Sequence, residues 1–209
     1  MYLSSQLHQL HREIKEKIHI EIQEQKNNNE IKFIELLSRL NIDLTEVNKL
    51  LDQVRYFDAP ASTQYMGAYP GGLCEHALRV VHELGVLCNA YYPGRYSEED
   101  VIKVALFKDL YKATMYEAYM KNVKNEETGQ WEVVPAYKTR EGTSRPVYGD
   151  LGFSSYMQIK KLVDLTDEQS EAIVYSRISD FAPDIHDVCR VYPLVTLTRM
   201  AEMAATYIS

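Results

Sequence analysis

Two separate segments of the chain carry side chains suited to metal chemistry. His76 follows Glu75 in GGLCEHALRV, and Asp109 stands between Lys108 and Lys112 in ALFKDLYK. Two antiparallel helices can bring an imidazole and a carboxylate side by side, as a divalent-metal site requires. A single histidine within a helical pattern is, however, more often a hydrogen-bonded core residue than a ligand, so both interpretations stay open.

Helical patterns surround both segments. We expect helices over IKFIELLSRL, over DLTEVNKLLDQVRYF with Asp43 or Thr45 as its cap, and over residues 73–90. Another helix should begin at Ser97, because SEED is a capping box. The Pro- and Gly-containing run DAPASTQYMGAYPGG predicts an ordered loop before the His76 helix.

Beyond the Asp109 segment the periodicity changes. AYMKNVKN and WEVVPAYKT flank EETGQ, a polar connection that contains glycine, and this pattern predicts a β-hairpin. Helical patterns resume in SSYMQIKKLV, in DEQSEAIVYSRIS after a Thr166 cap, and in LVTLTRMAEMAATYI. The chain is therefore predicted to be mainly α-helical with one inserted hairpin.

The N-terminal segment predicts an amphipathic helix over residues 3–25. Its apolar positions form one stripe: Leu3, Leu7, Leu10, Ile14, Ile18 and Ile22. The run QKNNNE (25–30) is expected to be a turn, which gives a helix and turn over 1–30 and a domain over 31–209. The stripe needs a partner surface, either the body of the same chain or, through residues 1–26, a protein partner or a second copy in a homodimer.

The composition limits the classes of protein. A chain of 209 residues with a formal net charge of -7 fits one domain with an appendage, and it disfavours a DNA-coating or membrane-surface role. Cys74, Cys88 and Cys189 form no closely spaced pair and are expected to be reduced. The N-terminus lacks the apolar core of a signal peptide, so we expect a cytoplasmic protein, in the host cytoplasm if the source is a phage.

GGLCEHALRV, VALFKDLYK, the hairpin and MAEMAATYI, in this order, resemble the HD-domain metal-dependent phosphohydrolase superfamily in its compact phage and bacterial form. The similarity runs from about Leu36 to Ile208. It implies a mainly α fold, an HD-domain-like helical bundle with one inserted β-hairpin, to which the N-terminal amphipathic helix is an addition.

The resemblance also implies a metal site, but its ligand positions are altered. His76 and Asp109 match ligands of the superfamily, whereas Lys108 stands where the naming motif has a histidine and Glu202 where the last helix has an aspartate. Because a charged ammonium has no lone pair, Lys108 cannot bind a cation. A dinuclear site of the usual kind is therefore not expected.

Other histidine positions of the compact members align here with Met66, Asp150 and Ser176. Lys108 would place a fixed positive charge where the metal lies in the superfamily. That charge could pair with Asp109, Glu202 or Asp150 and so satisfy a polar pocket without a metal.

Two functions follow as hypotheses. The first is a catalytically degenerate pseudo-hydrolase with no cofactor, which keeps a pocket for a nucleotide or phosphate or acts through protein contacts. The alternative is an active nucleotide phosphohydrolase with one Mg²⁺, Mn²⁺ or similar ion at His76, Asp109 and Glu202. Asp109 and Lys108 are the candidate catalytic residues in that case.

Ligand contacts are expected from Lys112, Arg140 and Tyr148. Lys112 stands where the superfamily often has a phosphate-contacting lysine, although it could equally be a solvated charge near a helix end. Arg140 belongs to a basic loop, and a tyrosine ring such as that of Tyr148 could stack on a base. His8 and His11 could meet on one helix face, but with no third ligand in view we interpret them as surface residues.

Overall fold

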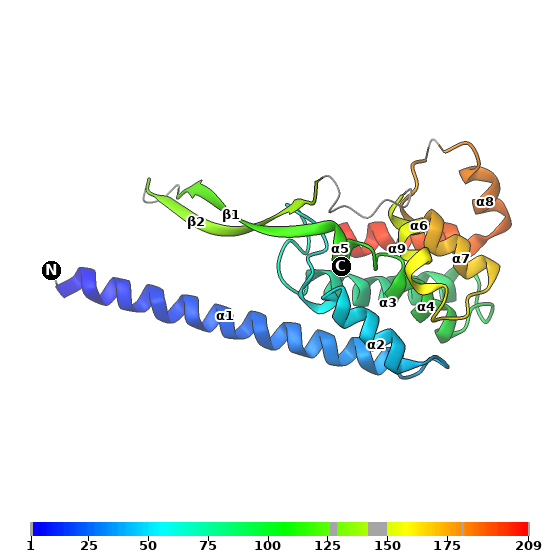
Figure 1. The fold of residues 1–209 in the computed structure, drawn as a ribbon, viewed down its shortest axis with the longest axis horizontal. Helices are drawn as coiled ribbons and strands as arrows, with labels where there is room; N and C mark the ends of the chain where they lie inside the picture. The colour runs from blue at the N-terminus through cyan, green and yellow to red at the C-terminus, as the bar shows by residue number, and fades with distance from the viewer. Residues whose placement is uncertain (1, 126–128, 142–149, 181, 209) are drawn as a thin grey trace.

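The computed structural model describes residues 2–125, 129–141, 150–180 and 182–208, with the side chains of residue 17 and of residues 20 onwards in its first helix. It is mainly helical with one antiparallel hairpin (Figure 1). The elements are α1 (Tyr2–Leu37), α2 (Leu44–Gln53), η1 (Tyr56–Asp58), α3 (Gly72–Tyr91), α4 (Glu98–Phe107), α5 (Lys112–Met115), β1 (Tyr116–Lys124), β2 (Trp131–Thr139), α6 (Leu151–Ile159), α7 (Asp167–Val174), η3 (Tyr175–Arg177), α8 (Ile185–Val191) and α9 (Pro193–Tyr207).

The helical body is built around α3. This helix packs against α9 and α4, and its Val80 and Leu84 are fully buried. The C-terminal part of α1 joins the same core through Phe33 and Leu37. The predicted mainly helical class is confirmed, while the narrower HD-domain description stays a prediction.

The predicted turn at residues 25–30 is wrong, because α1 continues through this run to Leu37. The amide of Gln23 donates to the Asn27 side chain at 2.9 Å and that of Gln25 to Asn29 at 3.3 Å, and such pairs four residues apart support a helix. Lys26 also forms an ion pair with Asp58. The division of the chain at residue 30 is untested, and that residue lies within α1.

Capping residues set the starts of several helices as predicted. The Asp43 carboxylate accepts from the backbone of α2, and Ser97 with Asp100 forms a capping box on α4. Thr166 does the same on α7 with Gln169. These short-range hydrogen bonds are encoded locally, which is why the sequence reveals them.

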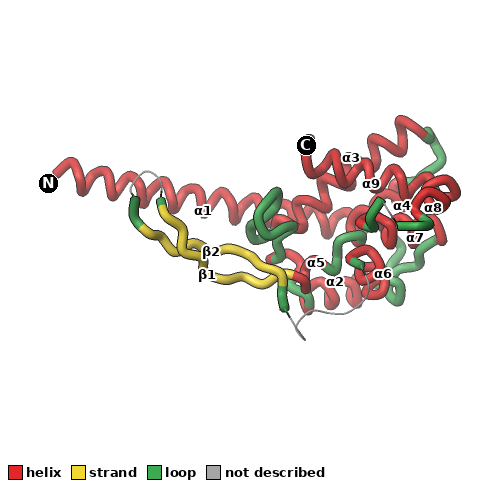
Figure 2. The backbone as a smooth tube through the Cα atoms, turned by 90° about the horizontal axis from the view of Figure 1, so that it is seen from above, coloured by secondary structure: helices red, strands yellow, loops and turns green. Residues whose placement is uncertain are grey.

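The hairpin pairs Tyr116 with Thr139 at its base and Lys124 with Trp131 near its tip. Its position and antiparallel pairing agree with the prediction. Both the hairpin and the N-terminal half of α1 project from the same end of the helical body, as Figure 2 also shows. In the described residues, no helix is long and apolar enough to cross a membrane.

Candidate functional site

Six ionisable side chains from four parts of the fold meet beneath a cavity. They are His76 on α3, the three residues Lys108, Asp109 and Lys112 at the turn from α4 to α5, Arg177 in η3 and Glu202 on α9, and we call them the charge cluster. Helices far apart in sequence therefore supply one site. The contact of α3 with α9 sets the distance between His76 and Glu202.

A tight turn between α4 and α5 supplies three members of the charge cluster. The backbone N–H of Lys112 donates to the Asp109 carbonyl at 2.9 Å, which turns the chain after α4. Phe107 and Leu110 are both fully buried on either side of Lys108 and Asp109. Because these apolar side chains hold the turn in the core, the neighbouring charged side chains are buried with it.

Lys108 lies at the centre of the cluster and is 0% exposed. Its ammonium donates to Asp109 Oδ2 and to Glu202 Oε2. Burial lowers the pKa of Lys108, but the two carboxylates raise it, and the net direction is upward. Lys108 is therefore a permanent cation at neutral pH, and the predicted pairing with Asp109 and Glu202 is present.

His76 lies against the same two carboxylates. Its Nε2 is 2.8 Å from Glu202 Oε2 and 3.5 Å from Asp109 Oδ2. Burial raises the pKa of Glu202, but Lys108 and the His76 hydrogen bond lower it, and it ends well below its usual range. Because the ionised carboxylate can only accept, the hydrogen bond requires a proton on Nε2.

The outer oxygens of the two carboxylates face two further cations. Arg177 donates to Glu202 Oε1. Lys112 Nζ lies 3.2 Å from Asp109 Oδ1 in an ion pair that lacks hydrogen-bond angles. Burial raises the pKa of Asp109, while Lys108 and then Lys112 lower it, and the net direction is strongly downward.

The cluster carries an excess of positive charge. Against the carboxylates of Asp109 and Glu202 stand Lys108 and Arg177, whose pKa values are raised, and Lys112, whose pKa burial lowers; when Lys112 is protonated they supply three cations. One positive charge is therefore uncompensated before any charge on His76 is counted. A buried excess of this kind favours an anionic ligand.

The three residues suggested as metal ligands lie together, but the Lys108 ammonium already lies between two of them. One ligand atom each from His76, Asp109 and Glu202 lie within 4.8 Å of one another. Lys108 donates hydrogen bonds to Asp109 Oδ2 and Glu202 Oε2, and these are the same two oxygens that lie near His76 Nε2. These residues do not fit a metal ion while Lys108 is charged, because the ion and the ammonium would be forced together.

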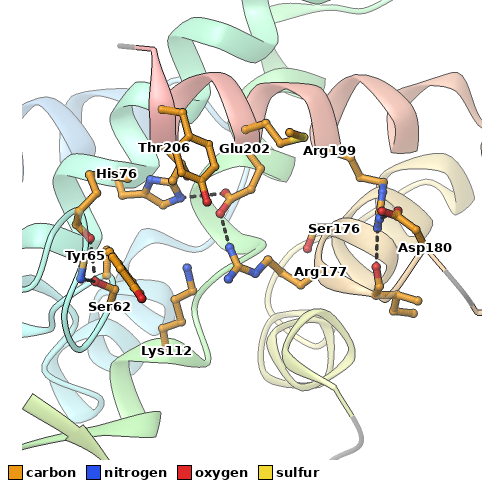
Figure 3. A pocket seen from close by; sticks show the side chains of 15 residues that line it. Ser62, Tyr65, His76, Lys112, Ser176, Arg177, Asp180, Arg199, Glu202 and Thr206 are labelled. Atoms are coloured by element: carbon orange, nitrogen blue, oxygen red, sulfur yellow. Dashed lines mark hydrogen bonds and ion pairs between the residues drawn. The ribbon is translucent and has the colours of Figure 1, made fainter.

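A cavity of about 940 Å³ opens over the cluster (Figure 3). Lys112 and Arg177 extend into it, and His76 and Glu202 form part of its wall. Lys108 and Asp109 are not part of this lining, so the central ion pair lies behind it. The exposed ring of Tyr65 is at the rim, which gives the cavity a basic floor and an aromatic edge.

Three positions align with further histidines of the superfamily, and only two of them lie at the cavity. Met66 and Ser176 both line the cavity, as their alignment implies. Asp150 instead caps α6, where its Oδ1 accepts from the Phe153 N–H at 2.9 Å. Of the three possible partners of Lys108, Asp109 and Glu202 are therefore the ones used, because the Asp150 carboxylate is engaged at a helix terminus.

Of the three residues predicted to contact a ligand, the structure places only Lys112 at the cavity. Lys112 lines the cavity and is only 3% exposed, so its interpretation as a solvated charge is wrong. Arg140 is not among the cavity residues, and its Nε donates to the Tyr116 carbonyl at the base of the hairpin. Tyr148 and the side chains of His8 and His11 lie outside the described part of the structure.

Two basic residues of the site escaped the sequence reasoning. Arg177 lies in the short η3 turn and contacts Glu202, and Arg199 on α9 donates to the Tyr175 and Ile178 carbonyls and to Asp180. The only available signal was that Arg177 directly follows Ser176, a position already aligned with the site.

Comparisons with protein-family models, with curated proteins and with solved structures find no match to this chain.

Proposed function

We propose that the protein is a catalytically inactive HD-domain-like pseudo-hydrolase whose cavity binds a phosphate-bearing ligand such as a nucleotide. The observation that carries this proposal is the Lys108 ammonium between Asp109 and Glu202. The resemblance of the His76 and Asp109 segments to the superfamily supports the choice of family. No step of hydrolysis is assigned to the site.

The position of Lys108 is the argument against hydrolysis. In metal-dependent phosphoryl chemistry a cation activates water and neutralises charge on the phosphoryl oxygens. Lys108 supplies positive charge but no coordination position for water. Its charge also neutralises the carboxylates that a metal would need, so the residues can hold an anion without activating a nucleophile.

Lys112 and Arg177 are the proposed anion contacts. Both reach the cavity, and each has a single carboxylate partner within the charge cluster. A phosphate oxygen could accept from both cations, since lysine offers three donors and arginine five. Hydrogen bonds to charged groups contribute about 1.5–3 kcal/mol each, enough for a specific contact.

The test is a calorimetric titration with inorganic phosphate and with adenosine monophosphate. Lys112→Met should weaken binding by about 10- to 100-fold, which corresponds to losing one such charged contact. The matched control is Lys103→Met, because Lys103 is also buried but pairs with Glu99 and the Asp164 carbonyl away from the cavity. Absence of binding at millimolar ligand, or equal losses in both variants, contradicts the proposal.

The alternative is an active mononuclear phosphohydrolase, favoured by the closeness of the His76, Asp109 and Glu202 ligand atoms. It predicts stoichiometric metal in the purified protein and phosphate release with Mg²⁺, Mn²⁺ or Co²⁺. Asp109→Ala should abolish that release. Turnover that depends on Asp109 would replace the pseudo-hydrolase proposal.

A further inference from the structure

One face of the hairpin is exposed and carries four apolar side chains beside Asn122 and Lys124. Side chains of paired residues point to the same face, so the pairs Met120–Pro135, Asn122–Val133 and Lys124–Trp131 share one surface. Met120 is 64% exposed, Val133 59% and Trp131 71%. We call Met120, Trp131, Val133 and Pro135 the hairpin face.

The hairpin face is not covered by its own chain in the described structure. Besides the pairing of its strands, the main contact of the hairpin is with α5 at its base. A two-stranded hairpin is only marginally stable alone in water, and exposed apolar side chains in a contiguous strip indicate a binding surface.

Residues 2–24 of α1, which we call the helix arm, also need a partner surface for their apolar positions. Only the end of the arm meets the body, where Glu21 and Ile22 line a cavity with Glu75 of α3, and the rest projects away from it (Figures 1 and 2). The sequence places leucine or isoleucine at three- and four-residue spacing along the arm, ending at the half-exposed Ile22. An isolated helix of this length gains little stability in water, so a packed apolar face should contribute most of it.

The helix arm and the hairpin, together called the two arms, match in direction and length. Both leave the same end of the body and run the same way. The helix arm is about 35 Å long at 1.5 Å per residue, and each strand is about 30 Å long. A second copy related by a two-fold axis across the arms would lay its helix arm along this hairpin, and the reverse contact would form by symmetry.

Electrostatics favour a second copy over a strongly charged partner. The helix arm carries Arg12, Lys15 and Lys17 against Glu13, Glu16, Glu21 and Glu24. Residues 116–140 carry Lys121, Lys124, Lys138 and Arg140 against Glu117, Glu126, Glu127 and Glu132. Both arms are thus nearly neutral, and the net charge of -7 lies almost entirely on the rest of the chain. Arm-to-arm contact keeps those repelling charges apart.

The contact area is sufficient for a specific dimer. A helix about 10 Å wide along a hairpin of about 30 Å covers about 300 Å² on each side. Two symmetric contacts bury about 1,200 Å² in total, at the lower edge of the range for specific interfaces.

We propose that two copies of the chain form a dimer in which the helix arm of each copy packs on the hairpin face of the other. This inference does not depend on the ligand cavity. It accounts for both projecting elements with one symmetric contact.

Trp131 allows a direct test, because it is the only tryptophan in the chain. Sedimentation equilibrium should give a dimer at micromolar concentration, and on dilution Trp131 emission should shift to longer wavelength and become more accessible to iodide. Val133→Lys should raise the dimer dissociation constant at least about tenfold, because it places a charge in an apolar contact. Ile18→Lys in the helix arm should do the same.

Val191→Lys is the matched control, since Val191 on α8 is also 59% exposed but is remote in sequence from both arms, and it should leave the dimer unchanged. A monomer at all concentrations, with Trp131 open to iodide, overturns the proposal. A dimer in which Trp131 stays open to iodide also overturns it, and indicates pairing of helix arms alone.

Discussion

Replacing Lys108 with methionine tests the reasoning about the buried charge cluster most directly. Methionine has a similar length and keeps the packing of the lysine stem, but it removes the ammonium that bridges Asp109 and Glu202. Each carboxylate keeps one other cation, Lys112 or Arg177. Removing one partner from a buried ion pair costs about 3–5 kcal/mol.

The assay is thermal unfolding at neutral pH. A loss of 3–5 kcal/mol corresponds to a fall in Tm of about 6–20 °C for a chain of this size. Lys103→Met is again the control, because its ion pair with the exposed Glu99 should contribute at most about 1 kcal/mol and its hydrogen bond to the Asp164 carbonyl about 1.5 kcal/mol. A Tm for Lys108→Met that falls no further than the control would refute the argument that Lys108 holds the two carboxylates together.

The pH dependence supplies a second readout. In the wild type the pKa of Asp109 and that of Glu202 are lowered, so their stabilisation is present above about pH 4 and is lost in acid. Without Lys108, burial and mutual repulsion should raise these pKa values. The Tm difference between wild type and variant should therefore narrow as the pH falls from 7 towards 4, and adding Glu202→Gln to the variant should recover part of the loss at pH 7.

Four further changes have expected outcomes in urea unfolding. Gly72→Ala should destabilise by about 1–3 kcal/mol, because its Cβ would lie 2.2 Å from the Gly67 carbonyl oxygen. Gly85→Ala should instead be neutral or stabilising by up to about 1 kcal/mol, since its Cβ meets only Val101 at 3.9 Å. Thr166→Ala removes the capping hydroxyl of α7 and should cost about 1 kcal/mol. Asp58→Asn should cost at most about 1 kcal/mol at pH 7, and because the Lys26 hydrogen bond lowers the carboxyl pKa, that cost should vanish as the pH falls below about 4.

Local signals in the sequence predicted the elements well where a short stretch determines them. The capping residues Ser97 and Thr166 and the hairpin connection act over a few residues, and the structure has each of them. The run at 25–30 misled because asparagine favours turns when considered alone. In the structure, Asn29 accepts from Gln25 and is 4% exposed against the body, so helical neighbours and tertiary packing outweigh its intrinsic preference.

The site could be predicted only where it resembled known motifs. His76, Asp109 and Glu202 come from three segments, and the structure brings their side chains together. Arg177 carries no periodic or motif signal, since its contact with Glu202 depends on how η3 packs against α9. The sequence could not decide between Asp150 and the other possible partners of Lys108, because an acidic residue before a helix is as well suited to capping as to charge pairing.

The competition between Lys108 and a metal ion can be expressed as a free energy. A metal at Asp109 and Glu202 would have to displace the ammonium or take its proton. Deprotonating an ordinary lysine at pH 7 costs about 4.6 kcal/mol, since its pKa is about 10.4, and this weakens metal binding about 10³-fold. The pKa of Lys108 is raised, so the cost here is larger. A mononuclear enzyme would therefore have to recover this energy from only three protein ligands, whereas an anion bound by Lys112 and Arg177 leaves the central ion pair intact.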